Sequence, residues 1–300
     1  MSVESSLSAP VRRREAAGAQ PRNRAGARAR RALPSLLAWA WALLSLYPLA
    51  WLVMQSFRSD ADILSRPWGL PVDGRLDGYA KAFESTPLAQ YFLNSLVVTV
   101  CVVLVSVACC TGAGYAFSKL RFPGSNTVFA VFIGVLVVPA PVLLLPVFLI
   151  SRDLGILDSY IGLIGPYAAG VLPLGVFLMK THFDSIPASF AEAAEIDRAT
   201  PWQTFVMVML PQVRPAAATV AVLAFMSAWN EYIYALVAIR SRELFTLPIG
   251  IADLSAKKFV YGYAPVFAAM VVTIIPVYLA FLLAQRSFLN SLALGGGVKG

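Results

Sequence analysis

Six long runs that carry no charge, or a single acid, dominate this 300-residue sequence. They cover residues 32–57, 85–118, 122–151, 159–179, 215–239 and 259–285. Each run can supply the roughly 20 helical residues that cross about 30 Å of hydrocarbon. Apolar residues make up 58% of the chain and charged residues 13%, which differs from the balance of ordinary soluble domains. The sequence therefore predicts an all-α, polytopic membrane protein with six transmembrane helices.

Basic residues are distributed unevenly between these runs. Eight of the 24 lysines and arginines are arginines within the first 31 positions. They stand among Ala, Gly, Pro and Ser residues that have little to bury, so residues 1–33 are predicted to be a disordered arm. With that arm inside, the inner segments hold fifteen basic residues and the outer segments nine. Because positive charge accumulates in cytoplasmic loops, this bias predicts cytoplasmic N- and C-termini.

The alternative interpretation of the arginine arm is a twin-arginine export signal. The sequence disfavours it, because the arginines lie far upstream of the apolar run and the run is too long for a signal core.

A polar insert at residues 185–215 separates the fourth and fifth runs and would lie in the cytoplasm. Its pattern predicts two short helices joined by a tight turn. Thr200 is suited to cap the second helix, Pro201 to its first position, and Gln203 to complete a capping box with Thr200. Pro211 is expected to close that helix.

The first helix of the insert is predicted at residues 188–197, with Pro187 in its first turn. Its acids Glu192, Glu195 and Asp197 stand on a surface otherwise made largely of alanine. A small, flat, acidic face allows close approach by a partner protein, so we interpret the insert as a docking device. The alternative is an ordinary polar loop with a chance helical pair.

The insert contains a spaced set of residues: Glu192, Ala193, Ala194, Asp197, Ala199, Phe205, Leu210 and Pro211. This set resembles the EAA loop of ABC importer permeases. The resemblance implies that residues 182–214 couple the membrane domain to a cytoplasmic ATPase. Arg198 departs from the family, which usually has glycine there; if its φ is positive, a side chain costs on the order of 1 kcal/mol.

Over nearly the whole chain after residue 33, the sequence is similar to the carbohydrate-importer, maltose-type branch of these permeases. The resemblance implies a type I ABC importer permease fold over residues 34–289 and a cytoplasmic tail at 290–300. It also implies a bacterial or archaeal plasma membrane and four kinds of partner: a second homologous permease in a heterodimer, a dimer of ATP-binding subunits, an external solute-binding protein and the lipid bilayer. Nucleic acid is not expected as a partner.

Two outer segments are distinguished by their turns. Residues 58–87 contain Trp68-Gly69-Leu70-Pro71 and Gly74, which predict a small ordered cap. Residues 240–262, which include Thr246-Leu247-Pro248, resemble the segment that faces the solute-binding protein in maltose-type permeases.

Two of the apolar runs contain residues that are costly in a membrane helix. Pro139, Pro141 and Pro146 predict a bent third crossing, which either lines a pathway or packs where neighbours satisfy the freed carbonyls. The fifth crossing contains Trp229, Asn230 and Glu231, which resemble a signature of carbohydrate importers and are candidates for the translocation pathway. The alternative for Glu231 is a structural acid hydrogen-bonded to a neighbouring helix or subunit.

The sequence contains no phosphate-binding loop, no dinucleotide fingerprint and no zinc-binding HExxH. Cys101, Cys109 and Cys110 lie in one apolar run and suggest neither a disulfide nor a metal site. We therefore expect no enzymatic activity, no cofactor and no metal, with energy supplied by a separate ATPase.

The function predicted is the permease subunit of an ATP-driven importer of a sugar or oligosaccharide. Three alternatives stay open: an ABC importer of another solute, a secondary transporter and a membrane-embedded enzyme. The last two are disfavoured because the sequence lacks a clear internal repeat and clustered acids or nucleophiles at membrane depth.

Overall fold

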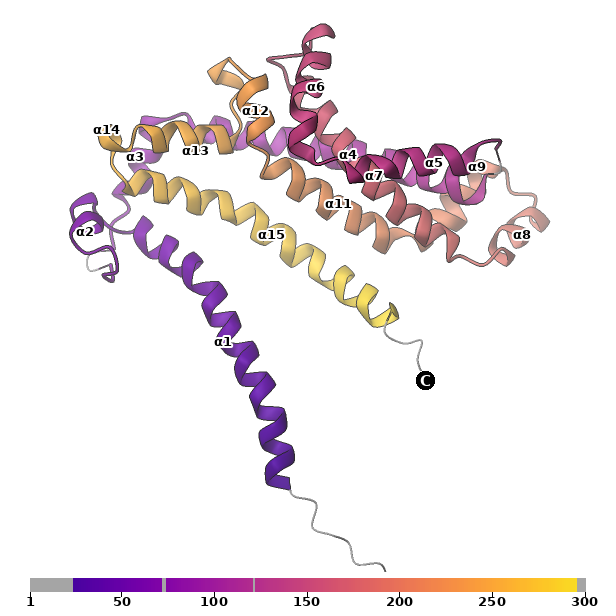
Figure 1. Ribbon diagram of the computed structural model, residues 1–300, viewed down its shortest axis with the longest axis horizontal. Coiled ribbons are helices and arrows are strands. Elements are labelled where there is room, and N and C mark those ends of the chain that lie inside the picture. The colour runs from indigo at the N-terminus through magenta and orange to yellow at the C-terminus, as the bar shows by residue number, and fades with distance from the viewer. Residues whose placement is uncertain (1–23, 72–73, 121, 296–300) are drawn as a thin grey trace, which may run out of the picture. The chain divides into compact units, whose positions relative to one another are not determined.

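The computed structural model describes residues 24–71, 74–120 and 122–295, and these residues form helices and turns without a strand. The chain divides into two units, Met1–Trp51 and Leu52–Gly300. The first unit contributes most of helix α1 (Arg24–Ser56). Every further element belongs to the second unit (Figure 1).

The second unit is built on four long helices: α4 (Leu88–Lys119), α7 (Tyr160–Asp184), α11 (Arg214–Trp229) and α15 (Ala264–Gly295). Helices α4 and α7 pack closely because glycines meet side chains at their crossing. A Cβ on Gly114 would strike Met179, and one on Gly175 would strike the sulfur of Cys110. Small residues at such crossings let the backbones of membrane helices approach each other.

Four helices of the described chain are long and apolar enough to cross a membrane without interruption: Pro34–Ser56, Leu88–Lys119, Tyr160–Asp184 and Ala264–Leu283. Two bent pairs raise the number to six if each pair is one span. The first bent pair, Ser125–Val137 with Ala140–Asp153, is the third predicted crossing, and the second joins Pro201–Gln212 of the insert to Arg214–Trp229 of the fifth.

The third crossing was predicted as one bent helix, but it consists of two separate helices. Helix α5 (Ser125–Gly134) continues into the 3₁₀ turn η1 (Val135–Val137), and α6 (Ala140–Asp153) then departs at 110°. Three prolines were expected to interrupt the backbone hydrogen bonds of this helix. Pro139 precedes α6, and Pro141 stands in its first turn, where no N–H is needed for a helical hydrogen bond. Pro146 lies inside α6 without ending it.

The fifth crossing is interrupted at its acid. Helix α11 ends at Trp229, and the short helix α12 (Ile233–Ala238) begins after a break of three residues. The prediction of one crossing at 215–239 is corrected accordingly: the helix stops where Asn230 and Glu231 begin the break.

Helices α1 and α15 extend into the two predicted terminal segments. Helix α1 begins at Arg24, inside the arm predicted at 1–33, because its Ala and Arg residues are strong helix formers. Helix α15 continues to Gly295, so half of the tail predicted at 290–300 is helical. Residues 1–23 and 296–300 lie outside the described residues.

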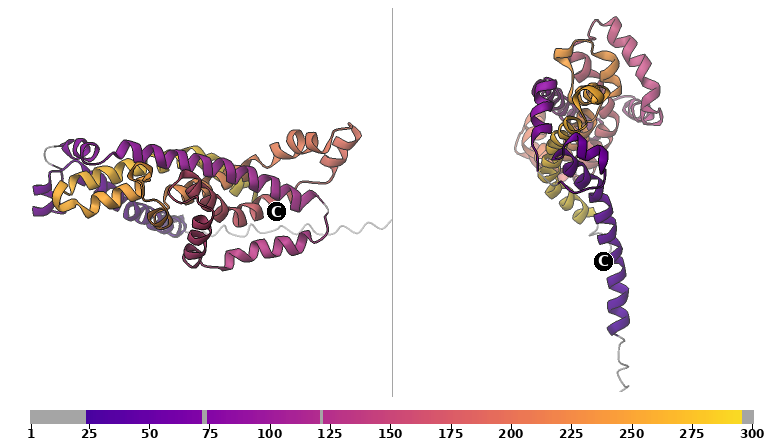
Figure 2. Two further views of the ribbon diagram at one scale, coloured as in Figure 1. Left: turned by 90° about the horizontal axis from the view of Figure 1, so that it is seen from above. Right: turned by 90° about the vertical axis from the view of Figure 1, so that its left-hand side faces the viewer.

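Short helices gather at one end of the second unit. They are α2 (Asp60–Ser65), α3 (Asp77–Ser85), η3 (Arg242–Leu244), α13 (Leu247–Ala256) and α14 (Lys258–Tyr261). The insert around Glu192 lies at the opposite end, as Figure 1 and the left view of Figure 2 show. The structure thus separates the predicted outer segments from the predicted cytoplasmic insert.

Asp60 connects α2 to the start of α15, two segments that are far apart in the sequence. Its Oδ1 accepts hydrogen bonds from the backbone N–H groups of Tyr263 (2.7 Å) and Ala264 (2.8 Å), at the start of α15. Gly262 has φ 96°, and a Cβ there would collide with the Asp60 carboxylate. Glycine is therefore required beside this contact.

We predict that Gly262→Ala destabilises the protein by about 2 kcal/mol, because it combines a strained φ with loss of the Asp60 cap. The melting temperature of the purified protein in mild detergent should fall. Gly165→Ala in α7 is the matched control, since its Cβ meets no described atom within 4 Å. Equal melting temperatures for the two variants would contradict the requirement for glycine at position 262.

Candidate functional site

The insert forms the predicted helical pair. Helix α8 (Ser189–Ile196) is followed by a tight turn and by a second helical segment at Pro201–Gln212. Helix α8 starts two residues after Pro187, whose carbonyl accepts a hydrogen bond from Phe190 N–H. The proline therefore precedes the helix instead of standing in its first turn.

Arg198 occupies the left-handed position that ends α8, with φ 55°. Its N–H donates to the Glu195 carbonyl (3.0 Å), and the Ala199 N–H donates to the Ala194 carbonyl (2.9 Å). These two bonds are the Schellman motif, in which glycine is the usual left-handed residue. Arginine thus stands at a position where the backbone favours glycine.

Thr200 and Gln203 begin the second segment with a complete capping box. The Gln203 N–H donates to Thr200 Oγ1 (3.3 Å), and the Thr200 N–H donates to Gln203 Oε1 (2.8 Å). Pro201 occupies the first turn of α9 (Pro201–Gln203), as predicted.

Pro211 does not close this helix. A π-helical stretch, Thr204–Met209, leads into α10 (Leu210–Gln212), which contains Pro211, and a 75° bend into α11 follows at Val213. The Leu210 N–H donates to the Phe205 carbonyl, five residues back. The wider π turn relieves the clash between a proline ring and the carbonyl four residues earlier, so the helix passes through Pro211.

The inner side of the insert is fixed to the long helices by aromatic contacts. The Tyr115 ring on α4 lies 4.7 Å from the Phe205 ring and 5.5 Å from the Phe183 ring on α7. Lys119 Nζ donates to the Ile186 carbonyl (3.0 Å). Since rings at these separations pack favourably, the insert and the ends of α4 and α7 form one packed body.

The predicted coupling residues divide between two sides of the insert. The exposed ones are Glu192, Ala193, Asp197 and Arg198. The half-buried or buried ones are Ala194, Ala199, Phe205, Leu210 and Pro211. The second group anchors the insert, and the first is accessible at the surface.

Sequence reasoning missed three apolar side chains on the exposed side. Ile196 is 82% exposed, Trp202 71% and Met207 70%. Large apolar residues inside an otherwise polar insert were the available signal, because exposed patches of this kind often mark contact surfaces.

Glu231 makes three hydrogen bonds at the break in the fifth crossing. Its carboxylate accepts from Tyr167 Oη (2.6 Å), from Tyr234 N–H (2.7 Å) and from Ala235 N–H (3.0 Å). The two backbone donors belong to the first turn of α12, so Glu231 caps that helix and connects it to α7.

The two residues before Glu231 lie differently. Trp229 is 1% exposed, packs against Phe92 and Phe225, and donates from Nε1 to the Thr273 carbonyl (3.2 Å). Asn230 is exposed, and its Nδ2 donates to the Met226 carbonyl (2.8 Å). The three candidate pathway residues therefore do not converge on one surface.

A second carboxylate holds the chain beyond α12. Asp158 accepts hydrogen bonds from the Arg240 and Ser241 N–H groups and from Ser241 Oγ (2.6 Å). The Ser241 contacts hold the pKa of Asp158 below its usual value. Within the described part of the chain, no group of three His, Cys, Asp or Glu side chains could hold a metal ion.

We predict that Arg198→Gly stabilises the end of α8 by about 1 kcal/mol, because glycine accepts the positive φ without strain. The Ala199 amide should then exchange its hydrogen about fivefold more slowly. Arg198→Ala is the control, since it removes the charge and keeps the strain. Equal exchange in both variants would show that φ is not what limits this turn.

Comparison with known proteins gives one consistent family. Residues 108–289 match the family described as the binding-protein-dependent transport system inner membrane component. The diacetylchitobiose uptake system permease protein NgcG of Streptomyces coelicolor is 33% identical over 256 residues, 85% of each chain. The arabinooligosaccharides transport system permease protein AraQ of Halalkalibacterium halodurans is 32% identical over 265 residues, 86% of this chain and 93% of that one.

A solved structure that is similar to this chain also comes from an ABC transporter. It is the crystal structure of a bacterial ABC transporter involved in the import of the acidic polysaccharide alginate, and one of its chains has a TM-score of 0.74 and 29% identity to this one. The match covers 86% of this chain and 96% of that chain. The protein therefore belongs to the family of binding-protein-dependent ABC importer permeases, the membrane components of transporters whose ATPase is a separate subunit.

Proposed function

We propose that this permease imports a sugar or oligosaccharide and forms half of the translocation pathway beside a second, homologous permease. The names of its relatives support a carbohydrate, since they refer to diacetylchitobiose, arabinooligosaccharides and alginate. An external solute-binding protein would deliver the solute, and a pair of ATP-binding subunits would supply the energy.

The division of the insert into an anchored and an exposed side carries the coupling part of this proposal. Its exposed side combines the acids Glu192 and Asp197 with the apolar Ile196 and Trp202. Apolar anchors with charges around them are typical of protein interfaces. The ATPase would bind this exposed side.

The anchored side would transmit the motion of the ATPase. Phe205 packs on Tyr115, which also packs on Phe183, so movement of the insert displaces α4 and α7 together. Closure of the ATP-binding subunits around ATP would carry the two inserts and rock the membrane helices. A central cavity would then exchange inward for outward access.

The same proposal fixes the remaining assignments. The permease domain would cover 34–289, with the arm at 1–33, the coupling loop at 182–214 and the tail at 290–300 in the cytoplasm. The end that contains α2, α3 and α13 would then face the solute-binding protein. Of the predicted pathway residues, Asn230 has the exposed side chain, and Glu231 would act mainly through its hydrogen bonds to α7 and α12.

We predict that Glu192→Lys lowers solute uptake about tenfold, because it reverses a charge at the proposed ATPase contact. The measurements are uptake into vesicles and recovery of the ATPase with the purified permease. The permease should still insert in the membrane, because the Glu192 side chain is exposed.

Glu84→Lys is the matched control, since it makes the same charge change at an exposed position of α3, at the opposite end of the second unit. Recovery of the ATPase should stay near wild type for this variant, because α3 lies far from the insert. Wild-type uptake by Glu192→Lys, or equal losses of the ATPase from both variants, would refute the assignment of the insert as the coupling surface.

A further inference from the structure

A loop after α1 exposes three large apolar side chains beside the end of a membrane span. We call residues 57–71 the Trp68 loop. Leu64, Trp68 and Leu70 are 63%, 74% and 72% exposed. The interpretation of this segment as a small cap gives these side chains no role, and their exposure requires a separate explanation.

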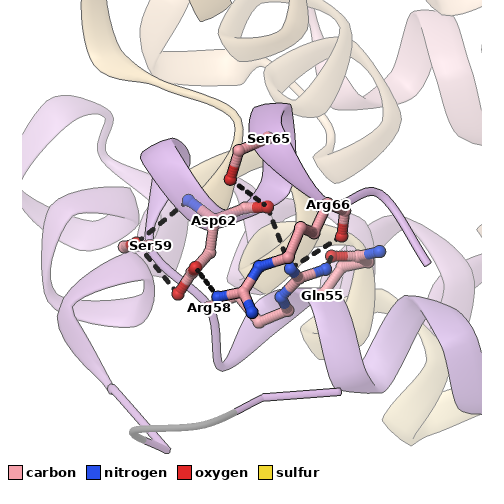
Figure 3. Close-up of polar contacts among 6 residues, drawn as sticks. All are labelled: Gln55, Arg58, Ser59, Asp62, Ser65 and Arg66. Atoms are coloured by element: carbon pink, nitrogen blue, oxygen red, sulfur yellow. Dashed lines mark hydrogen bonds and ion pairs between the residues drawn. The ribbon is translucent and has the colours of Figure 1, made fainter. Parts of the chain in front are cut away.

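The loop is held rigidly by Arg58, which is 3% exposed (Figure 3). Its Nη1 donates to Gln55 Oε1 (2.9 Å), and its Nη2 donates to the carbonyls of Asp62 (2.9 Å) and Arg66 (2.8 Å). The guanidinium therefore joins the last turn of α1 to Asp62 within α2 and to Arg66, which follows α2 and precedes Pro67.

Two further contacts set the position of the loop along α1. Gln55 donates from Nε2 to the Pro67 carbonyl, one residue before Trp68. After the loop, the Arg75 N–H donates to the Phe57 carbonyl (2.9 Å), so Arg75 lies beside the end of α1. Trp68 is thus held near the level of the last turn of α1 and does not extend far beyond it.

That level coincides with the edge of the bilayer. The span Pro34–Ser56 contains 23 residues, which as helix reach about 35 Å, against about 30 Å of hydrocarbon. Its end therefore lies within about one turn of the boundary between hydrocarbon and headgroups. The Asp60 contact to Ala264 connects the loop to the start of a second span, Ala264–Leu283.

We propose that Leu64, Trp68 and Leu70 anchor the Trp68 loop in the bilayer interface at this end of α1. Tryptophan is enriched at this depth because its ring is apolar and its N–H remains hydrated. Arg66 suits the same layer, because its side chain is 63% exposed, although its Nη2 also pairs with Asp62 Oδ1 (3.0 Å). Val53, on the last turn of α1, is a further exposed apolar residue before the loop.

The test places a fluorescent probe on the loop in the complete transporter. Trp68→Cys and Leu70→Cys are each labelled with an environment-sensitive dye, in a chain whose three cysteines are replaced by alanine. Lys81→Cys, exposed on α3, is the control. The transporter is reconstituted in vesicles of phosphatidylcholine and phosphatidylglycerol, with nitroxide lipids labelled near the headgroup or with aqueous iodide as quenchers.

The anchor predicts several-fold stronger quenching by nitroxide lipids at 68 and 70 than at 81, and stronger quenching by iodide at 81. Iodide quenching at 68 and 70 equal to that at 81 would overturn the proposal, because the loop would then lie in water. Protection of both positions from both quenchers would also overturn it, because a protein partner would then cover the loop. If Trp68→Cys does not fold, the labelled Leu70→Cys variant provides the test.

Discussion

Every break in a helix of a membrane protein frees backbone groups that the bilayer cannot satisfy. This chain meets the constraint with side chains from elsewhere in the sequence. Glu231 caps α12 after the break in the fifth crossing, and Asp60 accepts two N–H groups at the start of α15. Asp158 does the same for the backbone after α12. Carboxylates are suited to this task, because one oxygen can accept two backbone bonds.

These caps account for the placement of three of the sixteen acids, Asp60, Asp158 and Glu231. An acid within a membrane span is costly, and a functional or bonding role is the expected interpretation. For Glu231 the hydrogen bonds provide the role, since Tyr167 and the first turn of α12 occupy its carboxylate. The residue is important for the shape of the fifth crossing whether or not a solute approaches it.

Much of the fold could be predicted from the sequence, because hydrophobic length and capping chemistry are local properties. The capping box at Thr200 followed from residue types at fixed spacing, and so did the strain at Arg198. The 110° break in the third crossing did not, because Pro139, Pro141 and Pro146 each can bend, start or merely kink a helix. Their roles depend on position relative to the helix end, which tertiary packing decides. The burial of Trp229 could not be predicted from the sequence either, because its hydrogen bond to the Thr273 carbonyl joins two helices far apart in the chain.

Helix α7 is the physical link between the two sites that the sequence identified. Near one end it carries Phe183, in the aromatic cluster that holds the insert. Sixteen residues earlier, about 24 Å along a helix, it carries Tyr167, whose hydroxyl binds Glu231. In the proposed mechanism a displacement of the insert therefore reaches the break in the fifth crossing through one continuous helix. The glycine contacts between α7 and α4 prevent that helix from sliding freely against its neighbour, so the two helices move as a packed pair.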